Sequence, residues 1–295
     1  AVFFGNSGAE ANECAIKAAR KYSADTYGPG RERVLTLVNS FHGRTLATLA
    51  ATGQAVFHQD FGPFPEKFGY VPAGDLPALQ AAVGPDTCAL LLELVQGEGG
   101  VVALDPDYVR AAAEFCRARD ILLLVDEVQT GVGRTGTFLA CEQYGLRPDV
   151  VTLAKGLGGG LPIGAAVMSR KVADHMGPGS HGSTFGGNPV ACAGALAVLH
   201  TLDEALLQNV RAQAARLRAG LAALPHVAEV SGLGLMVGVA FADGVSAAAV
   251  RAACERAGLL VLTAKTRLRL LPPLILTQQD VDQALAVLRG VLEQI

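Results

Sequence analysis

The chain has 295 residues, of which 24 are basic and 27 acidic, so its net charge is −3 at pH 7. This balance excludes the strongly basic domain that is typical of nucleic-acid binders, and we expect no nucleic-acid partner. Hydrophobic residues make up 51% of the chain and charged residues 17%, which excludes a disordered protein and, at this length, favours two folded domains.

Apolar runs without polar alternation predict the strands of the first domain. Such runs are typical of strands that are buried on both faces of a largely parallel sheet. The predicted strands, in chain order, are Val34–Val38, Cys88–Leu92, Ile121–Val125, Val150–Leu153 and Ala165–Met168. Helical patterns lie between several of them, at Glu10–Tyr22 and at Pro106–Arg119, where Pro106 lies in the first turn. This alternation of strands and helices indicates α/β layers.

The sequence changes character after Pro189. A stretch rich in Ala, Leu and Arg runs to about Leu224. Beyond it we expect alternating segments at Ala228–Val230 and Leu235–Phe241, a helix at Ser246–Ala257, strands near Leu259–Leu262 and Leu268–Leu271, and a closing helix from Gln278. This pattern predicts a second, smaller α/β domain, so we assign residues 1–204 to a large domain and residues 205–295 to a small one.

Three further features concern location and completeness. No apolar run approaches the roughly 18–20 residues of a membrane span, so we expect no membrane partner. The six cysteines lie far apart without a C-x-x-C pair, which is typical of reduced thiols in a cytoplasmic protein and gives no zinc spacing. The chain opens within an apolar run, without a charged signal region or an initiator Met, and we expect an N-terminal portion to be missing.

A lysine and an aspartate stand out because each follows a predicted buried strand. Lys155 comes after DVVTLA and before GLGGG, where burial can desolvate its amine and make it a nucleophile that forms Schiff bases. Asp126 closes ILLLVD, at the carboxyl end of a strand, where open α/β sheets bind ligands. From position alone, a lysine that points to water and an aspartate that caps a helix remain open interpretations.

Two glycine-containing segments also have two interpretations. Ser7, Gly8 and Ala9 begin a helix whose N–H groups can bind a phosphate, although N-capping by Ser7 is the better interpretation of this segment alone. The segment Gly131–Gly136 matches the dinucleotide-binding pattern G-x-G-x-x-G and follows a strand. No long helix opens at its third glycine, so the context that the pattern requires is missing.

Two arginines are candidates for binding carboxylates. Arg44 lies in a loop after Phe41, and Arg269 lies two residues after Arg267 in a predicted strand, so these two arginines share one side of it. The planar guanidinium group suits bidentate binding of a carboxylate. The alternative for each is a surface ion pair that contributes little stability.

Together, these motifs resemble the class III (fold type I) aminotransferases, which use pyridoxal phosphate, and among them the acetylornithine-type members most closely. The motifs follow the order of that family along nearly the whole chain: FFGNSGAEANE, FHGRTLATLAATG, QGEGGV, VDEVQTGVGRTG, LAKGLGGGLPIGA, HGSTFGGNPVA, GLGLMVGV and LRLLPPL. The resemblance implies a large domain with a mixed, mostly parallel sheet, a smaller C-terminal α/β domain, and a family chain that is longer at its N-terminus.

The resemblance implies pyridoxal 5'-phosphate as the cofactor. Lys155 is implied to carry the cofactor covalently, and Asp126 to pair with its pyridine nitrogen and keep it protonated, so that the ring accepts electrons. The other implied cofactor contacts are Ser7, Gly8 and Ala9 at the phosphate, Thr184 of the neighbouring subunit at the same phosphate, Phe41 stacked on the ring, and Gln129 near the phenolic oxygen.

The resemblance also implies the substrates: N-acetylornithine as amino donor and 2-oxoglutarate as acceptor, which becomes glutamate, in a homodimer with shared active sites. Arg269 is implied to bind the α-carboxylate of glutamate, and Glu98 to neutralise Arg269 when acetylornithine binds. Arg44 is implied to hold a substrate carboxylate and Ser183 to contact substrate. Leu94 departs from the proline usual in the family, and its flexibility relaxes the strand exit that aims Glu98.

Other functions share some of these features. Related ω-aminotransferases that act on acyl-lysine, carrier-bound lysine, succinylornithine, ornithine or 4-aminobutyrate have nearly the same motifs, and His42 in FHGRT favours acetylornithine among them. A nicotinamide-dependent oxidoreductase that uses Gly131–Gly136 is a distant alternative. A homologue without catalytic activity is a third, since an N-terminal portion is expected to be missing.

Overall fold

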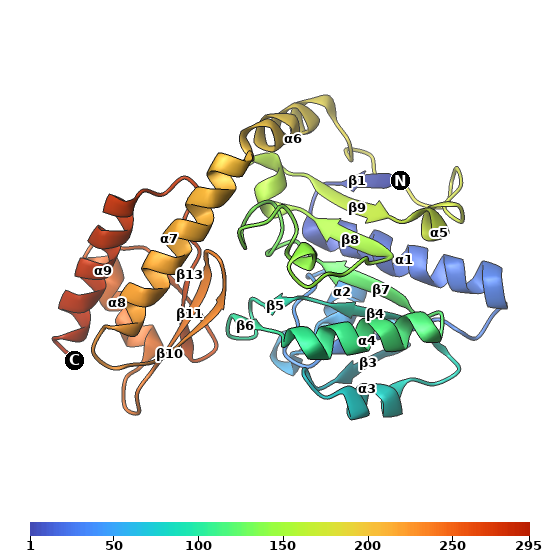
Figure 1. The fold of residues 1–295 in the computed structure, drawn as a ribbon. Coiled ribbons are helices and arrows are strands. Elements are labelled where there is room, and N and C mark those ends of the chain that lie inside the picture. Colours follow the sequence, from blue (N-terminus) through green and yellow to red (C-terminus); the bar gives the residue numbers. More distant parts are fainter. The chain divides into compact units, whose positions relative to one another are not determined.

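The computed structural model describes residues 1–295, which form two compact units (Figure 1). The first unit contains Ala1–Leu94, Leu104–Val132 and Leu139–Thr201, and the second contains Val95–Ala103, Gly133–Phe138 and Leu202–Ile295. No single helix is long and apolar enough to cross a membrane; only α6 (Pro189–Thr201) and α7 (Glu204–Ala222), taken together across the break between them, have the required length and composition.

A seven-stranded sheet forms the centre of the first unit, in the order β1-β9-β8-β7-β4-β2-β3. These strands are β1 (Val2–Gly5), β2 (Arg33–Leu37), β3 (Phe68–Val71), β4 (Thr87–Leu92), β7 (Leu122–Asp126), β8 (Val150–Leu153) and β9 (Gly164–Met168). From β3 to β8 the neighbouring strands are parallel, whereas β9 pairs antiparallel with β8 and with β1. The expected mixed, mostly parallel sheet is thereby confirmed.

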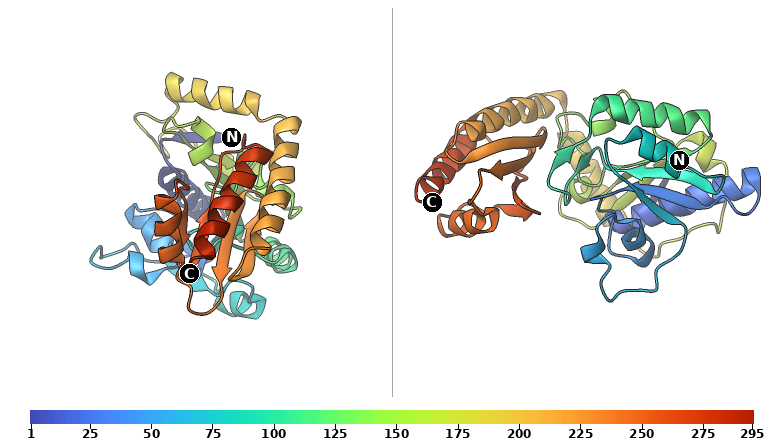
Figure 2. Two further views of the ribbon diagram at one scale, coloured as in Figure 1. Left: turned by 90° about the vertical axis from the view of Figure 1, so that its left-hand side faces the viewer. Right: turned by 90° about the horizontal axis from the view of Figure 1, so that it is seen from below.

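Helices cover both faces of this sheet (Figures 1 and 2). On one face α1 (Gly8–Tyr27) packs against β8 and β9 and contacts α2 (Leu46–Ala51) and α5 (Arg170–Ala173). On the other face α4 (Pro106–Ala118) packs against β7 and α3 (Leu76–Ala82). Because both faces are covered, the central strands β4 and β7 are buried at every position, which explains their continuous apolar sequence.

A four-stranded antiparallel sheet, in the order β10-β11-β13-β12, forms the centre of the second unit. Its strands are β10 (Val227–Leu233), β11 (Met236–Phe241), β12 (Leu262–Ala264) and β13 (Arg267–Leu270), and its helices are α7, α8 (Ala247–Arg256) and α9 (Gln278–Leu292). The short strands β5 (Val95–Gln96) and β6 (Val102–Ala103) belong to this unit, where Val95 and Val101 pack in a cluster with Met236 and Ala264.

The sequence-based elements omit β1, β3, β5, β6, α2, α3 and α5, and the structure is more specific than they are in two further places. The strand expected near Leu259–Leu262 is present as β12 but begins later. Gly258 ends the preceding turn with a φ of +83°, Leu260 is 84% exposed, and pairing begins only at Leu262. The long stretch after Pro189 is broken into two helices, because Asp203 accepts a hydrogen bond from the N–H of Leu206 and caps α7.

The expected boundary between a large domain (residues 1–204) and a small domain (residues 205–295) stays a prediction. In the structure the second unit resumes at Leu202 and also contains two earlier segments, 95–103 and 133–138. Long-range packing assigns these segments: the Arg134 guanidinium, for example, donates to the carbonyl of Leu235 at 3.2 Å. Such contacts have no local signal in the sequence.

The six cysteines are all unpaired, and every one except Cys192 is buried. Burial raises the pKa of the Cys88 and Cys116 thiols to about 12, so both thiols stay neutral and inert at physiological pH. Cys14, Cys88 and the residues of α1 and the central strands form one apolar cluster. These cysteines therefore serve as small core residues.

A cluster of polar side chains gathers around Asp120, just before the amino-terminal end of β7. The carboxylate of Asp120 accepts hydrogen bonds from three donors: the hydroxyls of Tyr22 (2.7 Å) and Tyr27, and the amine of Lys171 (2.5 Å). Partial burial opposes ionisation of Asp120, but these donors outweigh it and hold the pKa of that carboxyl at about 2. Asp120 thus joins α1, α5 and the turn before β7 as a charged group.

We expect Asp120→Asn to destabilise the first unit at neutral pH, because the amide cannot replace the charged acceptor. The pKa of Asp120 is lower in the folded chain than the unfolded value of about 3.9, so its stabilisation is complete above about pH 4 and is lost as the pH falls toward 2. Urea denaturation should show a difference in unfolding free energy at pH 7 that shrinks below pH 4. Asp174→Asn, at an exposed ion pair, is the control; a difference that does not change with pH would contradict the role of Asp120.

Candidate active site

A cavity of about 130 Å³ lies where the parallel strands β2, β4, β7 and β8 end. Its wall consists of residues that follow these strands, together with the start of α1. The lining residues are Gly8, Ala9, Asn12, Phe41, His42, Gly43, Glu93, Asp126, Val128, Gln129 and Lys155. Six residues that the sequence singled out for a cofactor are therefore neighbours in the structure, although they span most of the first unit.

Asp126 ends β7 and is 4% exposed. Its Oδ2 accepts from the side-chain amide of Asn12 and faces Nδ1 of His42, each at 2.8 Å. Its Oδ1 accepts from the backbone N–H of Val128 at 3.0 Å. Three donors thus stabilise a buried negative charge that would be costly without them, and Oδ1 keeps a lone pair for a further donor.

His42 is buried beside this carboxylate. Its Nδ1 faces an acceptor-only oxygen, so Nδ1 carries a proton and donates it to Asp126. Nε2 is buried without a hydrogen-bond partner. The backbone N–H of His42 donates to the hydroxyl of Thr52 at 3.0 Å, which fixes the loop that carries the ring. The geometry therefore gives His42 a role toward Asp126 that the motif did not reveal.

Lys155 lies just beyond β8, at the first position of a short 3-10 turn that extends to Gly158. Its φ is +40°, an unusual backbone conformation for a residue with a side chain, of the kind that collects at functional sites. The residue is exposed, so the burial expected to desolvate its amine is not provided by this chain alone.

The start of α1 combines capping with a free backbone edge. Ser7 accepts a hydrogen bond from the N–H of Glu10 at 3.2 Å, as N-capping predicts. The N–H groups of Gly8 and Ala9 precede Ala11, whose N–H is the first to donate to a backbone carbonyl of this segment, that of Ser7. A side chain at Gly8 would lie 2.7 Å from Cγ1 of Val128. Glycine therefore lets the helix start approach the loop after β7 and leaves its N–H groups at the cavity.

Phe41 is held by a buried acid. Its backbone N–H donates to Oε2 of Glu93 at 2.9 Å, and Glu93, directly after β4, is buried. The Phe41 ring meets Phe57 edge-on with centroids 5.6 Å apart. Arg44 is exposed, and its guanidinium lies 4.3 Å from the centre of the Phe57 ring and 5.4 Å from that of Phe41. The surface ion pair considered for Arg44 is therefore replaced by contacts with two aromatic rings.

Two other predicted residues lie in the glycine-rich loop before α6. The hydroxyl of Ser183 accepts from the side chain of Asn6 at 3.2 Å and from the N–H of Gly186 at 3.1 Å, which ties the loop to the segment before α1. Thr184 is exposed and does not line the cavity. Its expected contact with a phosphate in a neighbouring subunit stays a prediction.

Arg269 and Glu98 form an ion pair within the second unit. Nη1 of Arg269, on β13, lies 2.5 Å from Oε1 of Glu98, in the turn between β5 and β6. The arginine side chain is 10% exposed, and its Nε has no partner. Arg269 therefore has a specific partner, Glu98, whose side chain is 29% exposed.

Leu94, in place of the proline usual in the family, lies in a hydrogen-bonded and buried segment. The carbonyl of Leu94 accepts from the N–H of Leu104 at 2.9 Å and from the hydroxyl of Tyr144 at 3.3 Å. Leu94 itself is fully buried. Because a proline would offer the same carbonyl to these two donors, the expectation of a relaxed strand exit stays a prediction.

The segment Gly131–Gly136 forms turns, and no helix opens at its third glycine. Glu127, one residue after Asp126, organises the first part of this loop: its buried carboxylate accepts from the hydroxyl of Thr130 at 2.6 Å and from two backbone N–H groups, at Ala140 (3.0 Å) and Cys141 (2.7 Å). Burial raises the pKa of Glu127 despite these donors. Glu127 is a structural acid that does not line the cavity.

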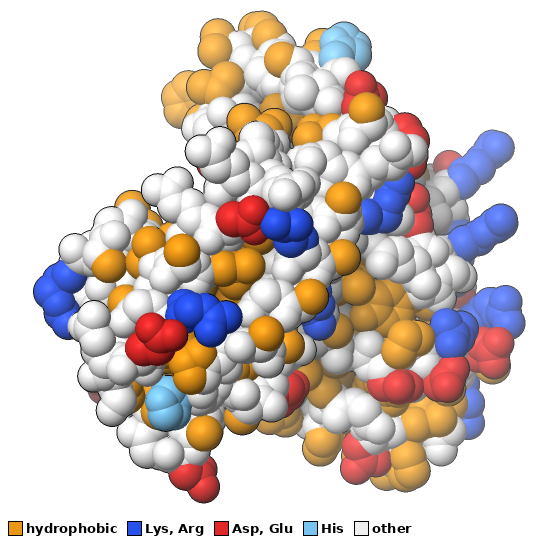
Figure 3. Space-filling view, turned by 60° about the vertical axis from the view of Figure 1, so that its left-hand side comes forward, with side chains coloured by type: hydrophobic (Ala, Val, Ile, Leu, Met, Phe, Trp, Pro, Cys, Tyr) orange, Lys and Arg blue, Asp and Glu red, His pale blue; other side chains and the backbone are white.

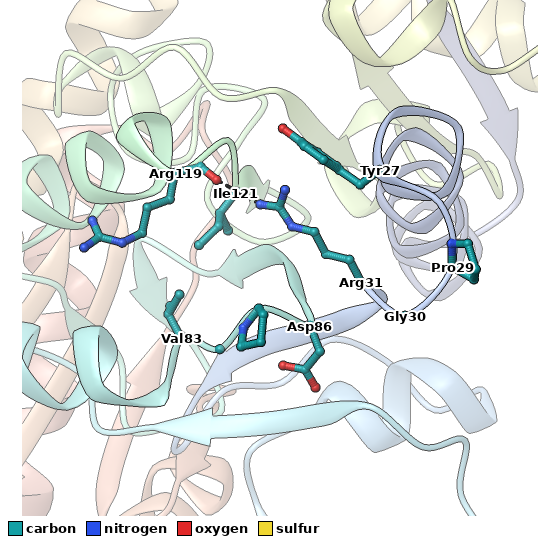
Figure 4. A pocket seen from close by; sticks show the side chains of 10 residues that line it. Tyr27, Pro29, Gly30, Arg31, Val83, Asp86, Arg119 and Ile121 are labelled. Atoms are coloured by element: carbon teal, nitrogen blue, oxygen red, sulfur yellow. Dashed lines mark hydrogen bonds between the residues drawn. The ribbon is translucent and has the colours of Figure 1, made fainter.

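A second hollow lies at the opposite, amino-terminal ends of the same strands (Figure 4). Figure 4 shows Arg31 in its centre, beside Tyr27 and Arg119. The guanidinium of Arg31 already donates to the carbonyls of Thr87 (2.9 Å), Arg119 (2.8 Å) and Asp120 (3.0 Å). Its charge is therefore used by the fold, and the cavity at the carboxyl ends remains the candidate site.

The family model of class III aminotransferases matches residues 1–292. The chain belongs to the class III aminotransferases. The acetylornithine aminotransferase of Haemophilus ducreyi is 54% identical to it over 294 residues, which cover 99% of this chain and 75% of that protein. The resemblance seen in the motifs is confirmed.

Solved structures confirm the fold of this class III aminotransferase. The N-acetylornithine aminotransferase of Stenotrophomonas maltophilia is 36% identical, with a TM-score of 0.85, and the match covers 99% of this chain and 74% of that one. An amine transaminase from an uncultivated Pseudomonas species, solved in its PLP-bound form, is 32% identical with a TM-score of 0.90 over 99% of this chain and 76% of that one.

Two polar residues of the aminotransferase cavity, Asn12 and Glu93, have no role assigned from the sequence. Asn12 is a polar residue on the apolar side of α1, next to the buried Ala11 and close to Ile16. A buried amide needs hydrogen-bond partners, so its position among apolar residues indicates a specific polar contact. Glu93 follows the apolar strand β4 as Asp126 follows β7, so the rule that selected Asp126 applied to it equally.

We expect Gly8→Ala to destabilise the aminotransferase by about 1–3 kcal/mol, because the added carbon would overlap Val128. Gly290→Ala is the matched control, since this glycine lies within α9 with open space beside it, and alanine there should stabilise by about 0.5–1 kcal/mol. Urea denaturation measures both changes. A Gly8→Ala variant as stable as wild type would contradict close packing at the start of α1.

Proposed function

We propose that this chain transfers the δ-amino group of N-acetylornithine to 2-oxoglutarate with pyridoxal 5'-phosphate, giving N-acetylglutamate semialdehyde and glutamate. One observation carries the cofactor part of this proposal: Asp126 and Lys155 line the same cavity, beside the start of α1. The donor is supported by the similarity to the acetylornithine aminotransferases of Haemophilus ducreyi and Stenotrophomonas maltophilia.

The chemistry of the cavity fits each part of the cofactor. A phosphate dianion suits the N–H groups of Gly8 and Ala9 and the Ser7 hydroxyl, because the start of a 20-residue helix attracts negative charge. A protonated pyridine nitrogen suits the buried carboxylate of Asp126. An aldehyde carbon suits a primary amine, and Lys155 is the lysine that lines this cavity.

Each of these residues has a definable task. When bound, the cofactor supplies an electron-accepting ring for the charge that develops at the carbon bearing the amino group. Oδ1 of Asp126, which has one donor and a free lone pair, would hold the proton on the pyridine nitrogen. Lys155 would hold the cofactor through its Nζ, and this amine would serve as the base that moves a proton at the substrate carbon. Phe41 would face the ring, and Gln129 would donate to the phenolic oxygen.

The ion pair of Arg269 and Glu98 is proposed to serve two different substrates at one position. Glutamate brings an α-carboxylate that takes the place of Glu98 on the guanidinium, whereas acetylornithine leaves the pair closed. The exchange is physically reasonable because a mostly buried arginine needs a negative partner in both states. Arg44 is proposed to hold the other substrate carboxylate, and Ser183 to contact substrate.

We further propose a cytoplasmic homodimer with shared active sites. Only Ala191 and Ala195 of α6 are buried, while Val190, Leu196 and Leu199 are exposed. Figure 3 shows hydrophobic side chains gathered at the top of its view, over this helix. Such a patch is typical of a protein interface, and six unpaired cysteines suit a reducing compartment. Sedimentation at the mass of one 30.4 kDa chain would contradict the dimer.

Lys155→Ala should abolish covalent attachment of the cofactor. After incubation with pyridoxal phosphate and reduction with borohydride, mass spectrometry should find the added mass on wild type and none on the variant, because no other lysine lines the cavity. Lys67→Ala, at a lysine that faces Asp86 on the surface, is the control and should label fully. Undiminished labelling of the Lys155 variant would remove this residue from the mechanism.

Arg269→Ala should slow the half-reaction with glutamate more than the half-reaction with acetylornithine. Loss of a charged hydrogen bond to the α-carboxylate is expected to lower the glutamate rate by roughly 10- to 100-fold in single-turnover measurements. Arg216→Ala, at an exposed pair with Asp282 in the same unit, should leave both rates unchanged. Equal losses in the two half-reactions would count against the exchange at Arg269.

A further inference from the structure

We propose that Asn12 and Thr152 are positioning residues for Asp126: the hydroxyl of Thr152 fixes the side-chain amide of Asn12, which in turn fixes the carboxylate. This inference rests on the proposed function, because it concerns the residue that would hold the cofactor ring. Neither residue needs to touch a substrate, and both act through Asp126.

Three elements bring this chain of contacts together. Thr152, on β8, lies opposite Asp126, on β7, in the parallel pairing of the two strands. Asn12 lies above them on α1. The Thr152 hydroxyl donates to Oδ1 of Asn12 at 2.7 Å, and Nδ2 of Asn12 donates to Oδ2 of Asp126 at 2.8 Å. All three residues are at most 4% exposed, so water does not compete for these bonds.

The surroundings of Asn12 permit one orientation of its amide. Nδ2 faces two groups that can only accept, the carboxylate of Asp126 and the backbone carbonyl of His42, which also lies at 2.8 Å. A flipped amide would set its own oxygen against both of them. The Thr152 hydroxyl completes the arrangement by satisfying the oxygen on the other side, which would be a costly buried acceptor without it.

The consequence for Asp126 is that its two oxygens are no longer equivalent. Oδ2 receives Asn12 and His42 and is saturated, whereas Oδ1 receives the N–H of Val128 and keeps one place free. Loss of the Asn12 contact would leave His42 as the remaining donor at Oδ2 and would weaken the hold on the orientation of the carboxylate. Thr152, through Asn12, thus helps to keep Oδ1 as the oxygen that is offered to the cofactor.

The sheet contains a natural control for a buried threonine without this role. Thr36, on β2, is fully buried, and its hydroxyl has no hydrogen-bond partner. Replacement by valine keeps the shape of threonine and removes the hydroxyl. At Thr36 that change removes an unpaired polar group, whereas at Thr152 it leaves Oδ1 of Asn12 unpaired.

The experiment compares Thr152→Val and Thr152→Ser with Thr36→Val in the dimeric enzyme. We expect Thr152→Val to weaken pyridoxal phosphate binding about tenfold, the equivalent of about 1.4 kcal/mol, and to lower kcat about tenfold with KM unchanged. Thr152→Ser keeps the hydroxyl and should restore both values to within about twofold, and Thr36→Val should match wild type. If the valine variant does not fold, Thr152→Ala against Thr152→Ser makes the same comparison.

A second measurement does not depend on the cofactor. In the cofactor-free protein, the side-chain amide hydrogens of Asn12 should exchange with solvent at least about tenfold faster in Thr152→Val than in wild type or Thr152→Ser. A valine variant that loses thermal stability but binds pyridoxal phosphate like wild type would overturn the positioning role. Wild type that binds no pyridoxal phosphate would refute the proposed function, while the amide exchange would still decide whether Thr152 fixes Asn12.

Discussion

A negative charge buried at the end of a strand is the constraint on which the site depends. Asp126 lies inside the first unit, where an unpaired carboxylate would be too costly to remain ionised. Its three donors come from separate parts of the chain: Asn12 from α1, His42 from the segment after β2, and Val128 from the loop after β7. The charge is therefore stable only when the sheet, the helix and both loops are assembled, and the site cannot form ahead of the fold.

The parallel sheet gives this assembly its direction. Strands β2, β4, β7 and β8 point the same way, so the residues that follow them meet at one edge and line one cavity. The opposite edge has polar residues too, but there Arg31 donates to three backbone carbonyls and Asp120 gathers three donors, so these charges join elements to one another. The same sheet thus has a structural edge and an edge with unsatisfied donors and acceptors for a ligand.

The local sequence pattern predicts the buried strands and the functional residues that directly follow them. Asp126 and Lys155 were found because each follows an apolar run, and most strands were found because they are buried on both faces. The partner of Asn12 lies 114 residues away in sequence, so no local pattern contained that contact. The exposure of Lys155 could not be predicted from the sequence either, since it depends on which segments cover the end of β8. The placement of 95–103 in the second unit followed from packing of Val101 against distant strands.

Asp126 and Glu127 show that surroundings, rather than residue type, separate a functional acid from a structural one. Strand alternation sends the two carboxylates to different sides, and both are buried. Glu127 accepts from Thr130 and from the backbone N–H groups of Ala140 and Cys141, which closes the loop after β7. That loop carries the N–H of Val128 that reaches Asp126 and brings Gln129 to the cavity. Glu127, which faces away from the cavity, therefore fixes the loop whose Val128 N–H stabilises Asp126.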